Sequence, residues 1–376
     1  MRRNFDFVSH WVWSRVTSSS SQTVFVHSGW RCSSTYVWSK FRQLDGVRAY
    51  YEPWHEQLER LNAQTLKVET PDNSGLRHPG GSRPYLGEFE PVLDPDGGVR
   101  GYHDRFALDR YFLDPDDEDL DQQAYLEGLI AAARERDEAP VLACCRTLGR
   151  IDWLKRRFDG FHIVLIRDPV QQWMSFYSLR RRPRPTYFEL CQYLILSELP
   201  GRDAQAQALL GSRFSRKGRL AERIAAVRRR LKRADAKVSF AAFMAVYLLS
   251  YLRALPQADL VIDVDRMAQD RDYALSVEAA IRQASGLTPD FSDCRTPERH
   301  DLAPVPFRAM ARAVVSDLDL KAAIASRESL LLYGKLANTF ALLPSQAPSA
   351  ADRWRAMMKG WMDGLARKVS LETTRR

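Results

Sequence analysis

The chain has 376 residues, of which 45% are hydrophobic and 27% charged, and its formal net charge is +9. The composition is that of an ordinary globular protein, and the length predicts one large domain with insertions, or at most two domains. The five cysteines show neither metal-ligand spacing nor a disulfide framework pattern, which suits a reducing compartment.

No segment of the sequence predicts a membrane span or a secretory signal. No run approaches 18 apolar residues, and the stretch MRRNFDFVSHWVWSRV at the start of the chain carries charge without a continuous apolar core. We therefore expect a cytoplasmic protein without a transmembrane segment.

Five short apolar runs predict the strands of an α/β fold. They cover residues 23–26, 47–51, 141–145, 162–166 and 259–264, and helical patterns separate them. This alternation predicts three layers, with helices on both faces of a central, mainly parallel sheet of about five strands. A helical part should follow residue 264, where RDYALSVEAAIRQASGL ends at Gly286 with Pro289 beyond it.

The stretch VFVHSGWRCSSTYVW, residues 24–38, predicts a strand, a tight turn and a helix whose start is rich in hydroxyl groups. The first backbone N–H groups of a helix have no partner within the helix, so this loop suits an anion. The P-loop pattern GxxxxGK[ST] is not met, because Ser34 stands five residues after Gly29 and the lysine is absent. The alternative is that the hydroxyl residues only cap the helix and that Arg31 is solvated.

The stretch AYYEPWHEQL follows the second apolar run and contains the candidate general base. Glu52 is expected at the carboxyl end of a strand, among Tyr50, Tyr51, Pro53 and Trp54, an apolar setting that suits a base. His55 and Glu56 are the alternatives. Glu52 could instead be a structural carboxylate that caps the helix after it.

Three further segments are unusual in composition. Residues 69–118 are dense in Pro, Gly and Asp, and are either a substrate-binding insertion or partly disordered. Residues 211–233 hold ten Lys or Arg against one acid, which marks either a face for an anionic partner or a solvated helix face. Residues 346–376 form a basic, amphipathic tail, expected to pack on the core or to make weak contact with a membrane surface or a partner.

The stretch FHIVLIRDPVQQWMSFYSL predicts a buried strand, then Arg167 at its carboxyl end, then a helix that begins at Pro169 and includes Ser175. Ligands of open parallel sheets bind outside the carboxyl ends of the strands. Pro169 and Ser175 are less than two helical turns apart, so the hydroxyl and the guanidinium can surround one phosphate.

Together, GWRCSSTYVW and VLIRDPVQQWMSFY resemble the P-loop-like sulfotransferases that use 3′-phosphoadenosine 5′-phosphosulfate (PAPS). In that family a basic residue and a hydroxyl pair follow the first strand, and an arginine stands eight residues before a serine. Arg31, the pair Ser34 and Thr35, and Arg167 with Ser175 match this pattern. DLVIDVDRMAQDRDYALSVEAAIRQASGL, residues 259–287, looks like the family's late strand, acidic loop and helix.

The resemblance implies a sulfotransferase domain over residues 1–345 that takes PAPS as co-substrate and needs no metal. The 5′-phosphosulfate would be held by the loop after the first strand, and the 3′-phosphate by Arg167 and Ser175. The implied loop residues are Arg31, Cys32, Ser33, Ser34, Thr35 and Tyr36. Arg31 would also stabilise the leaving phosphate, and Glu52 lies where the tyrosylprotein branch places its catalytic glutamate.

Two departures from the family pattern affect the expectations. The family has a glycine where this chain has Ser33, so Ser33 must keep an ordinary helical conformation if the backbone is to approach the phosphosulfate. The stretch FSRKGR at 214–219 echoes a 3′-phosphate signature but precedes the late strand, so Arg216 and Lys217 are left out of the site.

We expect the acceptor to be a hydroxyl of a carbohydrate or glycan precursor, since the chain has a large acidic, aromatic-containing insertion. The alternatives are a P-loop kinase and a non-catalytic protein that binds polyanions or nucleic acid through residues 211–233. The missing lysine and the lack of an evident magnesium-binding carboxylate argue against the kinase. No specific nucleic acid is expected as a partner.

Overall fold

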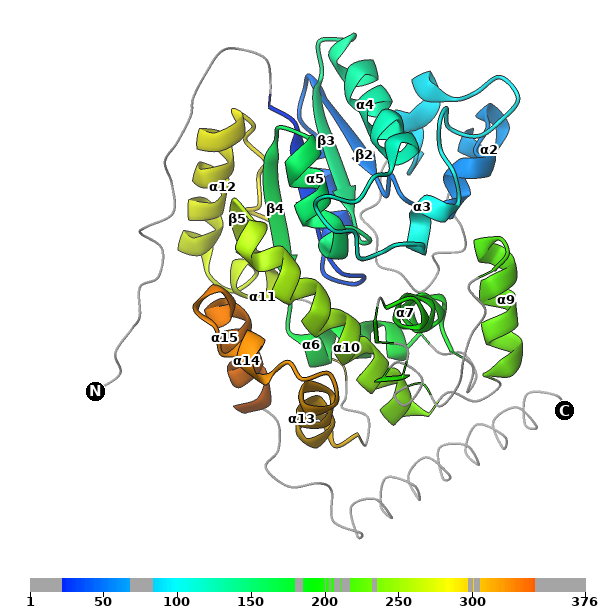
Figure 1. The fold of residues 1–376 in the computed structure, drawn as a ribbon. Helices are drawn as coiled ribbons and strands as arrows, with labels where there is room; N and C mark the ends of the chain where they lie inside the picture. The colour runs from blue at the N-terminus through cyan, green and yellow to red at the C-terminus, as the bar shows by residue number, and fades with distance from the viewer. Residues whose placement is uncertain are drawn as a thin grey trace, which may run out of the picture.

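The structure is a computed structural model that describes residues 22–67, 84–179, 185–199, 201–202, 204–205, 210, 217–231, 235–296, 300 and 305–341 (Figure 1). The expectations for the start of the chain and for the tail at 346–376 lie outside these ranges. So do those for residues 69–83 of the insertion and for the two ends of the basic stretch, 211–216 and 232–233.

The described residues form one five-stranded parallel sheet in the order β2-β3-β1-β4-β5. The strands are β1 (Val24–His27), β2 (Val47–Tyr51), β3 (Ala139–Cys144), β4 (Phe161–Ile166) and β5 (Leu260–Asp263). All four neighbouring pairs are parallel, as in the register Val24 with Val141 and Val24 with Phe161. Each strand coincides with a predicted apolar run to within two residues at either end.

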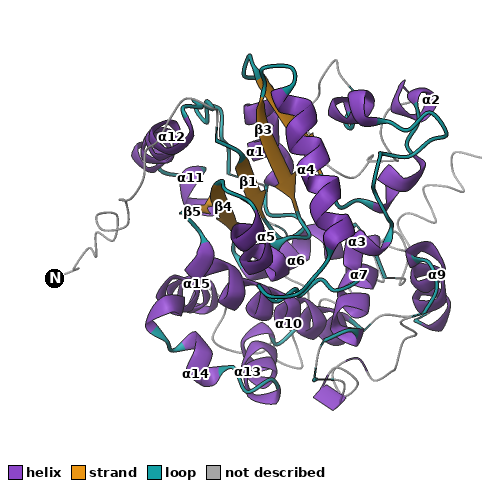
Figure 2. Ribbon diagram, turned by 45° about the horizontal axis from the view of Figure 1, so that its top comes forward, coloured by secondary structure: helices purple, strands orange, loops and turns teal. Residues whose placement is uncertain are grey.

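Helices cover both faces of the sheet and gather at its carboxyl edge (Figures 1 and 2). The α-helices are α1 (Ser34–Arg42), α2 (Ala63–Lys67), α3 (Arg105–Leu108), α4 (Leu120–Arg134), α5 (Ile151–Arg157), α6 (Pro169–Tyr177), α7 (Tyr187–Ser197), α9 (Leu220–Arg230), α10 (Ala236–Ala254), α11 (Val264–Met267), α12 (Arg271–Ser285), α13 (Phe307–Asp317), α14 (Lys321–Ile324) and α15 (Leu330–Ala341). Short 3₁₀ segments are η1 (Glu56–Arg60), η2 (Gly87–Val92), η3 (Leu148–Arg150), η4 (Leu255–Gln257) and η5 (Arg327–Ser329).

The two faces of the sheet bury separate sets of side chains, because successive residues of a strand point to opposite sides. Phe25 of β1 packs with α4 and α5, whereas Val24 and Val26 pack with α1 and α12. A third apolar cluster, built from α6, α7, α10 and α13, lies beyond the carboxyl ends of the strands. The predicted three-layer α/β fold with a helical C-terminal part is confirmed.

The helix predicted to end at Gly286 is α12, which stops at Ser285, and Gly286 takes a left-handed conformation with φ 74°. Glycine has no Cβ and adopts this conformation without strain, which is why it ends helices. The described part of the insertion, residues 84–118, contains η2 and α3 and contributes Phe89 and Phe106 to the core.

Within the described residues, one segment is long and apolar enough to cross a membrane: Ala236–Gln257, which comprises α10 and η4, with a mean hydropathy of 1.6. No such segment was expected from the sequence. However, 78% of the apolar 18-residue stretch within this segment is buried inside the fold, where α10 packs against α7 and α13. A central position among other helices accounts for the apolar composition.

Charged residues from the acidic insertion and the basic stretch pair with each other. Arg219, next to α9, forms ion pairs with Glu59 and Asp104, and Arg223 of α9 forms ion pairs with Asp109 and Glu198. Arg223 is buried. Arg223 is therefore a buried part of the fold's ion-pair network, whereas Arg219 forms its ion pairs at an exposed position.

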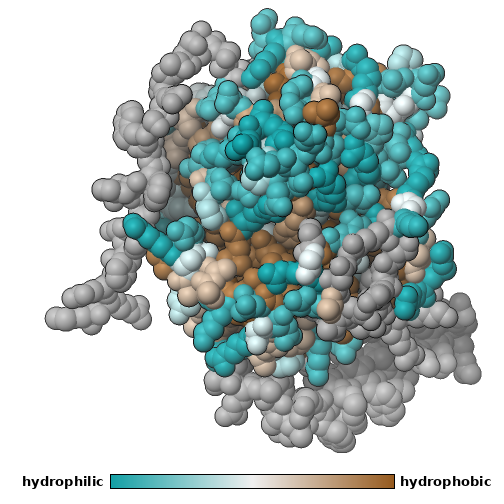
Figure 3. Space-filling view, in the orientation of Figure 1, coloured by the Kyte–Doolittle hydropathy of each residue, from teal (hydrophilic) through white to brown (hydrophobic). Residues whose placement is uncertain are grey.

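The space-filling view shows polar residues over the upper part of the molecule and apolar residues near the middle of the same face (Figure 3). Three large apolar side chains of α15, Leu330, Leu331 and Tyr333, are exposed.

Candidate active site

The structure brings together the two loops that the sequence singled out. The loop after β1 and the residues after β4 both lie at the carboxyl edge of the sheet, because β1 and β4 are parallel neighbours. Arg31 Nε donates a hydrogen bond to Ser175 Oγ over 3.0 Å, and Arg167 Nη1 donates to the backbone oxygen of Arg31 over 2.8 Å. Arg31, Arg167 and Ser175 therefore form one cluster, although 144 positions separate the first from the last.

The backbone of the loop is strained at two positions. Arg31 has φ 65° and Ser33 has φ 59°, both in the left-handed region that residues with a Cβ avoid. Ser33 therefore does not keep the ordinary helical conformation that would avoid crowding by its side chain. Ser33 instead takes the conformation that glycine favours, at a cost of about 1 to 2 kcal/mol, and such strain is concentrated at functional sites.

The cluster is rich in positive charge that no nearby carboxylate fully neutralises. Burial, and then the positive charge of Arg167, lower the pKa of Arg31. Arg167 is itself buried, and its Nε has no hydrogen-bond partner among the described residues; the carboxylate oxygen Asp265 Oδ1 is 3.8 Å away. Two guanidinium groups held close together, in front of a helix N-terminus, favour the binding of a multivalent anion.

The first turn of α1 adds backbone donors to this cluster. Ser33 is the N-cap of α1, but its side chain makes no capping hydrogen bond. The N–H groups of Ser34, Thr35 and Tyr36 open the helix and have no acceptor within it. The side chain of Tyr36 turns aside to bond Asp293, so only its backbone can serve the site.

The hydroxyl pair of the loop faces the end of β2. Ser34 Oγ lies 3.0 Å from Tyr51 Oη and 3.1 Å from Cys145 Sγ, and Thr35 Oγ1 lies 2.8 Å from the same tyrosine oxygen. Thr35 Oγ1 is also 3.3 Å from Tyr85 Oη, so the insertion reaches the site.

The side chain of Cys32 points away from the site. Its sulfur lies 3.7 Å from Tyr251 Oη in the core, and burial raises its pKa to about 12. Of this residue, only the backbone lines the loop.

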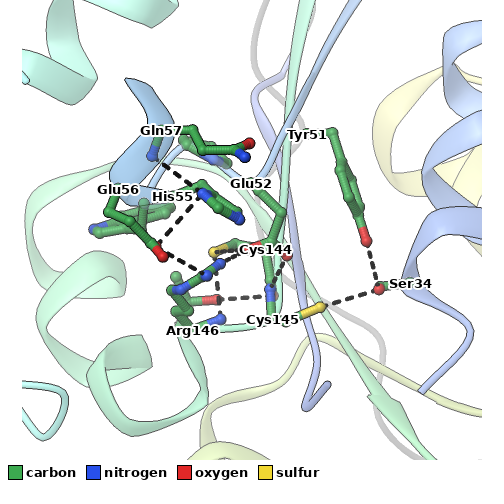
Figure 4. A network of polar contacts seen from close by, with 12 residues as sticks. Ser34, Tyr51, Glu52, His55, Glu56, Gln57, Cys144, Cys145 and Arg146 are labelled. Atoms are coloured by element: carbon green, nitrogen blue, oxygen red, sulfur yellow. Dashed lines mark hydrogen bonds and ion pairs between the residues drawn. The ribbon is translucent and has the colours of Figure 1, made fainter. Parts of the chain in front are cut away.

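Glu52 lies at the carboxyl end of β2, as expected, and both of its carboxylate oxygens are engaged (Figure 4). Oε1 accepts a hydrogen bond from Cys145 N over 2.8 Å, and Oε2 forms an ion pair with Arg146. Glu52 is buried and has φ 53°, a third strained position in the site. Cys145 contacts both Glu52 and Ser34, and so connects the candidate base to the loop.

The two alternative bases belong to the same network. Arg146 Nη2 lies 3.4 Å from Glu56 Oε2 and donates to Tyr187 Oη over 3.0 Å, and Tyr187 donates to Glu56 Oε1 over 2.5 Å. His55 Nδ1 is 3.4 Å from Glu56 Oε2 and also accepts a hydrogen bond from Gln57 N.

Burial, together with Arg146, lowers the pKa of His55. Burial alone would raise the pKa of Glu56, but His55, Arg146 and the Tyr187 hydroxyl lower it below its ordinary value.

Arg146 was missed in the sequence, although a signal was present. It stands two residues past the end of β3, at the same edge where Arg167 follows β4. The rule that ligands bind at the carboxyl ends of parallel strands applies to both. Arg146 also stacks against Trp30 of the loop, with its guanidinium carbon 5.6 Å from the ring centre.

No cluster of three or more His, Cys, Asp or Glu side chains in the described ranges is arranged to hold a metal ion. The predicted site residues are grouped into a cationic part around Arg31 and Arg167 and a carboxylate part around Glu52.

Comparison with known proteins adds one likeness. No protein-family model matches the chain, and a search of curated proteins finds no match. Among solved structures, the sulfotransferase domain of the olefin synthase of Synechococcus PCC 7002 is similar over 89% of this chain and 100% of that domain, with 16% identity and a TM-score of 0.32. A likeness of this degree carries no argument about activity, which must rest on the geometry of the site.

Proposed function

We propose that the protein is a sulfotransferase that transfers a sulfuryl group from PAPS to an acceptor hydroxyl. The observation that carries the proposal is the convergence of Arg31, Arg167 and Ser175 in front of α1. The 5′-phosphosulfate and the 3′-phosphate of PAPS are attached to the same ribose, so two cationic positions that lie close together can hold both, and these two arginines supply them from separate loops.

The residues divide the reaction between them. The acceptor oxygen forms a bond to sulfur while the bond between sulfur and the bridging oxygen breaks, and adenosine 3′,5′-bisphosphate leaves. Arg31 and the N–H groups of Ser34 and Thr35 stabilise the charge on the leaving phosphate. Glu52 takes the proton of the acceptor hydroxyl, and Arg167 with Ser175 holds the 3′-phosphate.

For the acceptor we propose a carbohydrate hydroxyl. Support comes from Tyr85, a partly buried tyrosine of the insertion whose ring packs edge to face with the buried Tyr51 and whose hydroxyl lies 3.3 Å from Thr35 Oγ1 of the loop. Aromatic faces combined with hydroxyl donors suit a ligand that is polar at its rim and apolar on its faces.

Thermal melting with four ligands tests the nucleotide assignment. Adenosine 3′,5′-bisphosphate should raise the midpoint, since a ligand that binds only the folded state stabilises it. Adenosine 5′-phosphate should raise it less. A larger rise with ATP and magnesium would favour a kinase, and a rise only with an oligonucleotide would favour a polyanion-binding protein.

A further inference from the structure

Helix α15 lies beside the carboxyl ends of β4 and β5 (Figures 1 and 2). Two of its side chains, Lys335 and Thr339, are one turn apart and so lie on the same face of the helix. Lys335 Nζ is 2.7 Å from Asp263 Oδ1 and 2.5 Å from Asp265 Oδ2.

The same face contacts the segment that carries Arg167. Thr339 Oγ1 donates to Asp168 Oδ2 over 3.1 Å. The backbone N–H of Asp168 in turn donates to Asp265 Oδ2 over 2.6 Å. Asp168 directly follows Arg167, so α15 holds the backbone next to this arginine from two directions.

Asp265 is shared between two cations. Its Oδ2 contacts Lys335, and its Oδ1 is 3.8 Å from Arg167 Nε, which has no hydrogen-bond partner in the part of the chain that the structure describes. Burial by itself would lower the pKa of Lys335, but Asp265 and Asp263 raise it above its ordinary value. Lys335 therefore carries a positive charge, and only 10% of its side chain is exposed.

Removal of the positive charge of Lys335 would change the electrostatic interaction between Asp265 and Arg167. Asp263 and Asp265 would then lose their shared counter-ion, and Asp265 would attract Arg167 more strongly. Charges a few ångströms apart at a poorly solvated site interact more strongly than they would in water.

We propose that Lys335 is a positioning residue of the nucleotide site. By neutralising Asp263 and Asp265, it keeps Arg167 available for the 3′-phosphate and links the affinity for that phosphate to the docking of α15. The inference rests on the proposed function, because it assumes that Arg167 binds a 3′-phosphate.

The experiment compares adenosine 3′,5′-bisphosphate with adenosine 5′-phosphate by titration calorimetry. Lys335→Met should reduce the preference for the bisphosphate by about tenfold, a typical coupling between linked sites, with little change for the monophosphate. Lys335→Arg should keep the preference, since it keeps the charge. Lys321→Met, which removes an exposed lysine from α14, is the matched control and should behave as the wild type.

Two additions separate a positioning role from a structural one. Lys335→Gln keeps a hydrogen-bond donor and replaces the methionine variant if that protein does not fold; it should show the same loss. In an Arg167→Ala background, Lys335→Met should have no further effect on bisphosphate affinity, because the residue through which it acts is gone.

The outcomes distinguish this inference from the proposed function. A wild type that prefers the bisphosphate, with Lys335 variants that keep the preference or weaken both nucleotides equally, would overturn the inference and leave the function standing. A wild type with no preference for the bisphosphate would overturn both.

Discussion

Among single residues, Arg167 offers the most direct test of the site. Arg167→Ala should weaken adenosine 3′,5′-bisphosphate by about tenfold to a hundredfold, the range for a lost charge-assisted hydrogen bond, and adenosine 5′-phosphate far less. Only the bisphosphate carries the group that this arginine is proposed to hold. Ser175→Ala should change the selectivity in the same direction by a smaller factor. Equal losses for both nucleotides, measured by calorimetry, would defeat the assignment.

Glu52→Gln tests the general base. Turnover should fall by about a hundredfold or more, and the acidic limb of the pH–rate profile should disappear, because the amide cannot accept the proton. The variant should still bind adenosine 3′,5′-bisphosphate, although its melting temperature should fall, since Arg146 loses one of its two carboxylate partners.

Two control variants separate basicity from the ion-pair network. Glu56→Gln removes the other carboxylate that contacts Arg146, and His55→Ala removes the third candidate base. Both should reduce turnover much less than Glu52→Gln. A folded, nucleotide-binding Glu52→Gln protein with wild-type turnover would show that Glu52 is only a structural partner of Arg146.

At the scale of elements, the start of α1 stores strain that a single substitution can relieve. Ser33→Gly should stabilise the protein by up to about 1 kcal/mol, because glycine adopts φ 59° without a Cβ clash. Ser276→Gly, at an exposed position inside α12, should destabilise it by about 0.5 kcal/mol instead. Denaturant unfolding measures both changes. A loss of stability for Ser33→Gly would contradict the strained conformation.

The strands β1 and β4 carry a pair of buried histidines that predicts how stability depends on pH. The rings of His27 and His162 stack with centroids 5.3 Å apart, and His27 Nε2 lies 3.0 Å from His162 Nδ1. Burial lowers the pKa of His27 well below its ordinary value and lowers that of His162 to about 4.

The unfolded chain therefore binds protons first as the pH falls. The free energy of unfolding should drop between pH 6.5 and about 4, by up to about 3 kcal/mol for His162 alone. His162→Gln should flatten this slope relative to the wild type, whereas His103→Gln, at an exposed position, should not. Identical slopes for all three proteins in denaturant titrations at several pH values would refute the prediction.

At the scale of the whole molecule, the spacing of apolar residues and the residues that end strands and helices were sufficient to predict the fold class. Each strand is a short apolar run bounded by polar residues, and α12 ends at a glycine. These signals are local: each can be recognised within its own segment, without knowing which other segments pack against it. The burial of α10 was not foreseen, because the length and composition of an apolar helix do not distinguish a buried core helix from a membrane-spanning one.

The sequence by itself determined which polar residues stand after the strands. Arg31, Glu52 and Arg167 each follow an apolar run. A parallel sheet must bring such ends to one edge. Only the tertiary structure decided which side chains meet there. The pairing of Glu52 with Arg146, the sharing of Asp265 between Arg167 and Lys335, and the left-handed backbone at Ser33 each depend on strand order, on helix docking or on a loop conformation. These are contacts between residues far apart in the chain, and their energies depend on burial and distance, which no local pattern in the sequence encodes.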